Sequence, residues 1–253
     1  MKKVLSLWFC LVLLACGDTD ENTIGEADNN STQSCSRSDA NLCDPELITL
    51  LPLNDAVTSV QASAVASGEQ KSITIDASAG GISAYPQQPW VYFNLSRGEI
   101  VYISDYEALA STDWDIALRR YVIRLNGGVS GPGCAALASV TGQTFDGLNK
   151  VPDNLNWQTD TYIKNWPSSC GSLETDIAGF GQPNAPMINT VWEFGQTLCS
   201  CSVCPTNTPM IINTALGARA KLEVAGYYPG QDSNINSCSG SSANITLRWQ
   251  MLD

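Results

Sequence analysis

The run at residues 244–251 alternates apolar and polar side chains with a period of two. Its apolar members fall on one face of an extended chain: Ile245, Leu247, Trp249 and Met251. Successive side chains of a strand point to opposite faces, so this pattern predicts a half-buried strand in an antiparallel sheet. A helix would scatter the same residues around its circumference.

Other segments carry the same type of signal. Extended, β-rich runs lie at 71–76, 90–95, 100–104, 114–125 and 221–228, and no long segment has a helical period. Only 15% of the residues are charged and 43% are hydrophobic, a globular composition. We therefore expect an all-β fold of antiparallel sheets.

Two local signals refine the run at 114–125. Its apolar phase slips at Arg119–Arg120, which predicts a β-bulge, and Asn126–Gly127 at its end predicts a hairpin turn. The following stretch, 129–215, is rich in proline and turn residues. We therefore expect long, disulfide-stapled loops there. Binding residues often lie in such segments.

The N-terminus resembles a bacterial lipoprotein signal. Lys2 and Lys3 precede the apolar run 4–14, which is too short to span a membrane, and small residues lead to Cys16. We expect a signal peptide at 1–15, with Cys16 as the lipid anchor that attaches the exported chain to a membrane. Gly17, rather than an aspartate, follows the cysteine and favours the outer membrane.

Charge divides the rest of the chain. Cleavage would leave 11 of the 13 basic residues against all 25 acidic ones, a formal charge of −14. Residues 16–46 are acidic and lack aromatic residues, so we expect a lipidated tether there and a β-domain at 47–253. A specific acidic binding tail is the alternative for 16–46. Nucleic acid is excluded as a partner, because its phosphates require cations.

The sequence contains no histidine. Ser-His-Asp and Cys-His catalysis, His-ligated zinc and bis-histidine haem are therefore excluded. Glycosidase chemistry needs only two carboxylates, which Asp113 and Asp115 could supply. These two show no acid–base asymmetry in the sequence, so we expect no enzymatic activity.

Eight cysteines remain after export and removal of the signal, and in an oxidising compartment they predict up to four disulfides. They are Cys35, Cys43, Cys134, Cys170, Cys199, Cys201, Cys204 and Cys238. Proximity favours Cys35–Cys43 and Cys134–Cys170, and Cys238 would join one member of the 199/201/204 group. The alternatives for that group are a thiolate zinc or iron–sulfur site and a redox CxxC pair. We expect no metal.

Several segments together resemble a known family. Asp113-Trp-Asp-Ile-Ala-Leu-Arg-Arg-Tyr-Val-Ile-Arg-Leu-Asn-Gly-Gly128 is similar to the signature strand of the HmuY family of bacterial haem-binding lipoproteins. Weaker likenesses lie at 91–98, 217–228 and 245–250, in the family's order. The resemblance implies an all-β lipoprotein that holds haem in a cleft and passes it to an outer-membrane receptor.

Haem would need iron ligands other than histidine, and Met, Tyr and Cys are the side chains available. The candidate ligands are Met187 and Met210, both after proline in the loop-rich region; Tyr227 and Tyr228 are further options. Aromatic walls could come from Trp157, Trp166 and Trp192. Arg119, Arg120 and Arg124 could satisfy carboxylates within the sheet or grip propionates. The alternative is a non-haem envelope module that binds another ligand or a protein partner.

Overall fold

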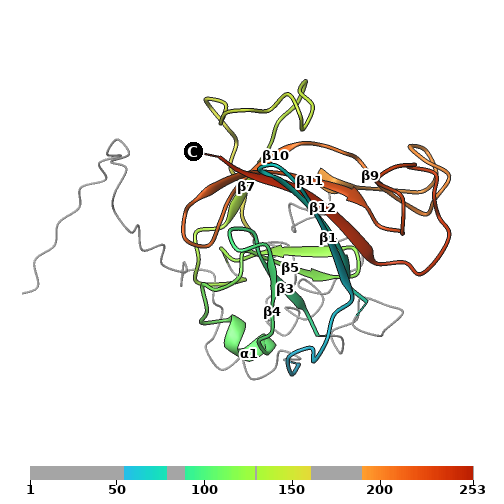
Figure 1. Ribbon diagram of the computed structural model, residues 1–253. Coiled ribbons are helices and arrows are strands. Elements are labelled where there is room, and N and C mark those ends of the chain that lie inside the picture. Colours follow the sequence, from blue (N-terminus) through green and yellow to red (C-terminus); the bar gives the residue numbers. More distant parts are fainter. Residues whose placement is uncertain (1–53, 79–88, 129, 161–189, 253) are drawn as a thin grey trace, which may run out of the picture. The chain divides into compact units, whose positions relative to one another are not determined.

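The computed structural model describes residues 54–78, 89–128, 130–160 and 190–252, and these residues form antiparallel β-sheets (Figure 1). The strands are β1 (Ala62–Ser67), β2 (Gln70–Asp76), β3 (Val91–Asn94), β4 (Glu99–Val101), β5 (Ile116–Arg119), β6 (Val122–Leu125), β7 (Ala136–Ser139), β8 (Trp192–Phe194), β9 (Val203–Pro205), β10 (Met210–Asn213), β11 (Arg219–Gly226) and β12 (Asn244–Leu252). A short helix, α1 (Asp105–Ala108), follows β4. Within these ranges no helix has the length and apolar character needed to cross a membrane. The all-β, antiparallel prediction is confirmed.

The larger sheet has six strands in the order β1-β2-β12-β11-β10-β7. The last strand of the chain, β12, lies inside it between β2 and β11. Ile245, Leu247 and Trp249 are buried on the face that the alternation predicts, and Met251 is half-buried at the strand's end. The apolar–polar alternation therefore correctly predicted this strand and the face that it buries.

The smaller sheet has four strands in the order β4-β3-β5-β6. Here the predicted β-bulge is wrong: Arg120 and Tyr121 form a two-residue turn, and β5 pairs with β6 as a hairpin. Arg120 has φ of +53°, a left-handed conformation that such tight hairpin turns require. The phase slip at Arg119–Arg120 thus marks a reversal of the chain.

Trp249 joins the two sheets. Its ring packs edge-on against Phe93 of β3 with centroids 5.3 Å apart, and its Nε1 donates to the Leu95 carbonyl over 2.9 Å. Both aromatic side chains are fully or almost fully buried. The core therefore lies between the sheets, with an indole that is both packed and hydrogen-bonded at its centre.

Three further segments differ from expectation. Asn126–Gly127 ends β6 but makes no hairpin; Asn126 bonds through its backbone to both Asp115 and Ala135. The stretch expected to be irregular contains β7 to β10, strands of only three or four residues, which are too short to show a period-two alternation. Helix α1 also escaped prediction, although Ser104 and Glu107 form a complete capping box at its start.

Candidate functional site

The four-stranded sheet has two different faces. Phe93, Ile116 and Leu118 point toward the six-stranded sheet, and the residues between them point away from it. We call the second set the arginine face: Trp90, Tyr92, Ala117, Arg119, Val122 and Arg124. All six are buried, so a face with two guanidinium groups lies inside the protein.

The two arginines share one aromatic partner. The guanidinium carbons of Arg119 and Arg124 lie 4.1 and 4.6 Å from the ring centroid of Trp90. Burial, and next the charge of Arg124, lower the pKa of Arg119 to about 9, so Arg119 remains a cation at neutral pH. Desolvated cation–π contacts of this kind are worth about 2 kcal/mol each. They explain how two buried cations can be tolerated side by side.

Asp105 of α1 supplies a negative charge that interacts with Arg119. It accepts hydrogen bonds from the Tyr92 hydroxyl at 2.9 Å, from the Trp90 backbone N–H at 3.3 Å, and from Asn54. Burial raises the pKa of Tyr92 well above its usual range, so this phenol stays neutral and donates. The capping box at Ser104 thus places a carboxylate under the arginine face.

A second buried carboxylate lies at the end of β6. Asp160 accepts from the Leu125 backbone N–H at 3.0 Å, and its Oδ1 has no hydrogen-bond partner in the described part of the chain. Arg124 donates to Ser130 nearby. Burial raises the pKa of Asp160 to about 6. Buried, perturbed groups of this kind occur at functional sites and in structural networks alike.

The predicted carboxylate pair is divided between two environments. Asp115 is buried, and its carboxylate accepts from the backbone N–H groups of Leu95 and Ala215, each at 2.7 Å. Burial raises the pKa of this carboxyl. Asp113 is mostly exposed and lies 3.8 Å from Arg97. Asp115 thus ties two loops together, an arrangement typical of a structural carboxylate.

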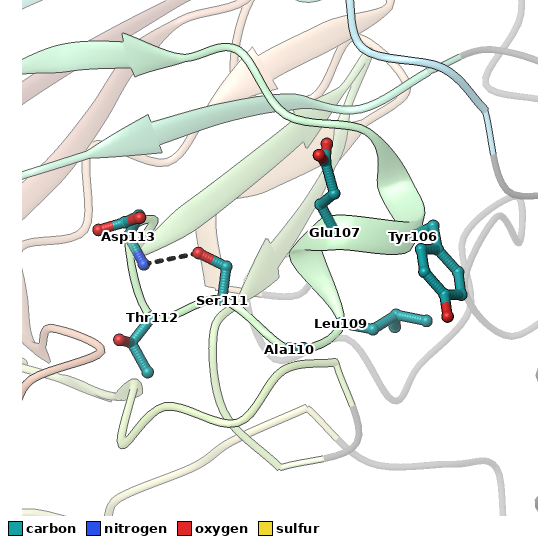
Figure 2. A pocket seen from close by; sticks show the side chains of 7 residues that line it. All are labelled: Tyr106, Glu107, Leu109, Ala110, Ser111, Thr112 and Asp113. Carbon is teal, nitrogen blue, oxygen red and sulfur yellow. Dashed lines mark hydrogen bonds between the residues drawn. The ribbon is translucent and has the colours of Figure 1, made fainter.

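An open hollow of about 760 Å³ is lined by α1 and the segment that follows it (Figure 2). Tyr106 and Leu109 lie together at one end, and Ser111, Thr112 and Asp113 lie at the other. Tyr106 is 69% exposed, and Asp113 N–H donates to Ser111 Oγ at 3.1 Å. The hollow has the size of a small-molecule pocket. It combines an apolar aromatic wall with hydroxyl and carboxyl groups. Sequence reasoning missed this hollow because it depends on the unpredicted helix.

The predicted haem residues do not form an iron site in the described part of the chain. Met210 lies in the interior of the six-stranded sheet and is 0% exposed, while Tyr227 is 3% exposed and packs against Trp192 and Tyr228. Met187 and Trp166 lie outside the described residues, as does the expected anchor Cys16. An axial ligand must present its donor atom to a cleft. Met210 and Tyr227, whose side chains are buried in the core, therefore do not fit an axial haem ligand, whereas Tyr228 is half-buried and stays a prediction.

The cysteine group forms two crossed disulfides. Cys199 pairs with Cys204, and Cys201, which lies between them, pairs with Cys238. The prediction that Cys238 joins this group is confirmed. Bonded sulfurs are not thiolates, so these four cannot ligate zinc or an iron–sulfur centre in this form. Cys134 is also disulfide-bonded, whereas Cys35, Cys43 and Cys170 lie outside the described residues.

Gln231 organises the polypeptide around these disulfides. Its amide oxygen accepts from the Tyr227 and Tyr228 backbone N–H groups, and its amide nitrogen donates to the Val203 and Ile235 carbonyls, both at 3.1 Å. It is 2% exposed. No sequence signal pointed to Gln231, because its burial and its hydrogen bond to the distant Val203 depend on the folded structure.

The chain is similar to one known protein family. The family model described as HmuY protein matches residues 86–249, more than half of the chain. No curated protein gives a significant match.

Three solved structures are similar. The HmuY analogue of Tannerella forsythia is 16% identical, covers 77% of this chain and 99% of its own, and has a TM-score of 0.46. A HmuY-like heme binding protein from Bacteroides vulgatus is 16% identical, with coverages of 72% and 91% and a TM-score of 0.44. A lipoprotein from Bacteroides fragilis is 14% identical, with coverages of 74% and 91% and a TM-score of 0.46.

Proposed function

Because the chain belongs to the HmuY family, we propose that it is an exported, lipid-anchored binding protein of the bacterial cell envelope. Residues 1–15 direct export, Cys16 carries the lipid, and residues 16–46 hold the β-domain away from the outer membrane. Its role is to bind and hand over a ligand, and it catalyses no reaction. The partner that receives the ligand is an outer-membrane receptor or another envelope protein.

Haem or a related porphyrin is the ligand class that family membership favours. In this chain the ligand is held through its flat macrocycle and its polar edge, since Met210 and Tyr227 are packed in the core and Cys199, Cys201, Cys204 and Cys238 are bonded to each other. The observation that carries this proposal is the open hollow beside α1, where the exposed Tyr106 and the half-buried Leu109 offer an apolar contact.

A non-haem ligand or a protein partner is the second candidate function. The complete burial of Met210 favours it, because this residue was one of the two predicted ligands and its sulfur packs inside the sheet. In that case the family fold serves a different ligand at the same envelope location.

Titration with haem and with metal-free protoporphyrin separates these functions. We expect both compounds to bind saturably at one equivalent with similar affinity, because the iron contributes little. Tyr106→Ala should weaken both, whereas Tyr102→Ala, an exposed tyrosine outside the hollow, should not.

Two other results would change the assignment. Binding of haem alone, lost in Met187→Leu, would show that Met187 ligates the iron. Binding of neither compound, in either redox state of the haem iron, would support the non-haem function.

A further inference from the structure

β1 forms an open edge of the six-stranded sheet. Its six residues are exposed on both faces, and it pairs with β2 in regular register without a bulge. The opposite edge is covered, because Leu137 of β7 exchanges both backbone hydrogen bonds with Gln158. Sheets usually protect an open edge with charge, proline or a bulge, and β1 has none of these.

The register shows which backbone groups face outward. Asp76 N–H donates to the Gln61 carbonyl at 2.9 Å, so odd-numbered residues of β1 direct their N–H and C=O groups toward β2. Ala62, Ala64 and Ala66 therefore direct theirs away from the sheet. Within the described ranges these outward groups have no backbone partner.

The side chains of β1 are arranged symmetrically. The segment Ser63-Ala-Val-Ala-Ser67 reads the same in both directions, with Val65 at its centre. If a second copy runs antiparallel with Val65 facing Val65, serine faces serine and alanine faces alanine. Val65 is 69% exposed, an unusual amount for a β-branched residue in a strand.

We propose that β1 is a self-association edge that pairs antiparallel with β1 of a second copy, about a two-fold axis at Val65. The outward N–H and C=O groups of Ala64 then bond to those of Ala66 in the second copy, and those of Ala66 bond to Ala64. Val65 occupies a non-hydrogen-bonded position, where facing side chains approach most closely. The pairing covers the exposed valines and joins two six-stranded sheets edge to edge.

The charge of β1 permits this contact, and the charge of the whole chain should make the dimer depend on salt concentration. β1 has no charged residue, so no like charges face each other across the pairing. Each mature copy nevertheless carries a net negative charge and repels the other at long range. Raising the salt from about 0.01 to about 0.15 M shortens the Debye length from about 30 to about 8 Å and should strengthen the dimer.

Sedimentation velocity of the complete mature chain, residues 16–253 without its lipid, tests the proposal. We expect a concentration-dependent monomer–dimer equilibrium that shifts toward the dimer with added salt. Val65→Lys and Val65→Glu should each weaken it by about tenfold or more, because like charges would face each other. An equimolar mixture of the two variants should restore the dimer, because opposite charges would then face each other.

Leu216→Lys is the matched control, since Leu216 is 77% exposed and lies in the turn between β10 and β11. It should leave the dimer unchanged, and circular dichroism should show the same fold for all variants. A wild-type chain that stays monomeric at all concentrations, or a dimer that survives Val65→Lys, would overturn the proposal.

Discussion

The β5–β6 hairpin and the cysteine-linked region, residues 190–205 and 228–243, are stabilised in different ways. Every residue of β5 and β6 is buried, and the hairpin lies between Trp90 on one face and the main core on the other. The strands β8 and β9 have three residues each, and Phe194 and Leu198 are about half exposed. Apolar burial holds the first region, whereas the second adds two disulfides and one buried amide to a few buried side chains, Val191, Trp192 and Val203.

Removing the indole beside the hairpin should have the largest effect. Trp114 is fully buried, contacts Tyr92 edge-on, and donates from Nε1 to the Ala108 carbonyl at 3.0 Å. We expect Trp114→Ala to lower the free energy of unfolding by about 3–5 kcal/mol, measured by urea denaturation. Leu216→Ala, at an exposed position, should change it little. An equally small effect of Trp114→Ala would mean that burial does not dominate the hairpin.

Breaking the disulfides should act on the cysteine-linked region. Cys201 and Cys238 are 37 positions apart and Cys199 and Cys204 only 5, so replacing each pair by alanine should cost about 4 and about 2 kcal/mol respectively. Hydrogen exchange should show loss of protection at residues 228–243 while β5 and β6 stay protected. Loss of protection in both regions together would show that they unfold as one unit.

Gln231→Met should produce a smaller loss, of about 1–3 kcal/mol, because the substitution leaves buried N–H and C=O groups of its neighbours without partners. Both disulfides should still form, as mass spectrometry of the unreduced protein can verify. A stability equal to that of the unsubstituted chain would show that the disulfides alone hold the region.

The last change concerns Asp160 at the end of the hairpin, and it has the opposite sign, a gain of stability. Its folded pKa of about 6 lies above the usual 3.8, so the fold loses stability as the pH rises from about 4 to about 6, and the full cost is present above pH 6. Asp160→Asn should therefore be more stable than the unsubstituted chain by about 3 kcal/mol at pH 7.5 and nearly equal to it at pH 4. Thermal unfolding at both pH values measures this difference; a gain of equal size at both would exclude titration of Asp160 as its cause.

Sequence reasoning succeeded where local pattern and structure coincide. The alternation that ends in Trp249 predicted β12 and its buried face, and the crowding of cysteines predicted that Cys238 would join the 199/201/204 group. The hairpin at Arg120 was misread, because a two-residue turn and a bulge shift the apolar phase in the same way.

The candidate site was much less predictable. The contacts of Arg119, Arg124 and Asp105 join strands and a helix that are distant in sequence, so no local pattern carries them. The hollow depends on α1, whose four residues are too few to show a helical period. Only the capping sequence from Ser104 to Glu107 signalled it.

The crossed disulfides have a consequence for biogenesis. A chain that crosses a membrane from its N-terminus presents Cys199, Cys201 and Cys204 before Cys238. Pairing in order of appearance would join Cys199 to Cys201 and leave Cys204 for Cys238, whereas the folded protein has Cys199–Cys204 and Cys201–Cys238. The correct links therefore require either that oxidation waits for the C-terminal segment or that early bonds are exchanged. Correct maturation of this protein thus needs either late oxidation or thiol–disulfide exchange in the compartment where it folds.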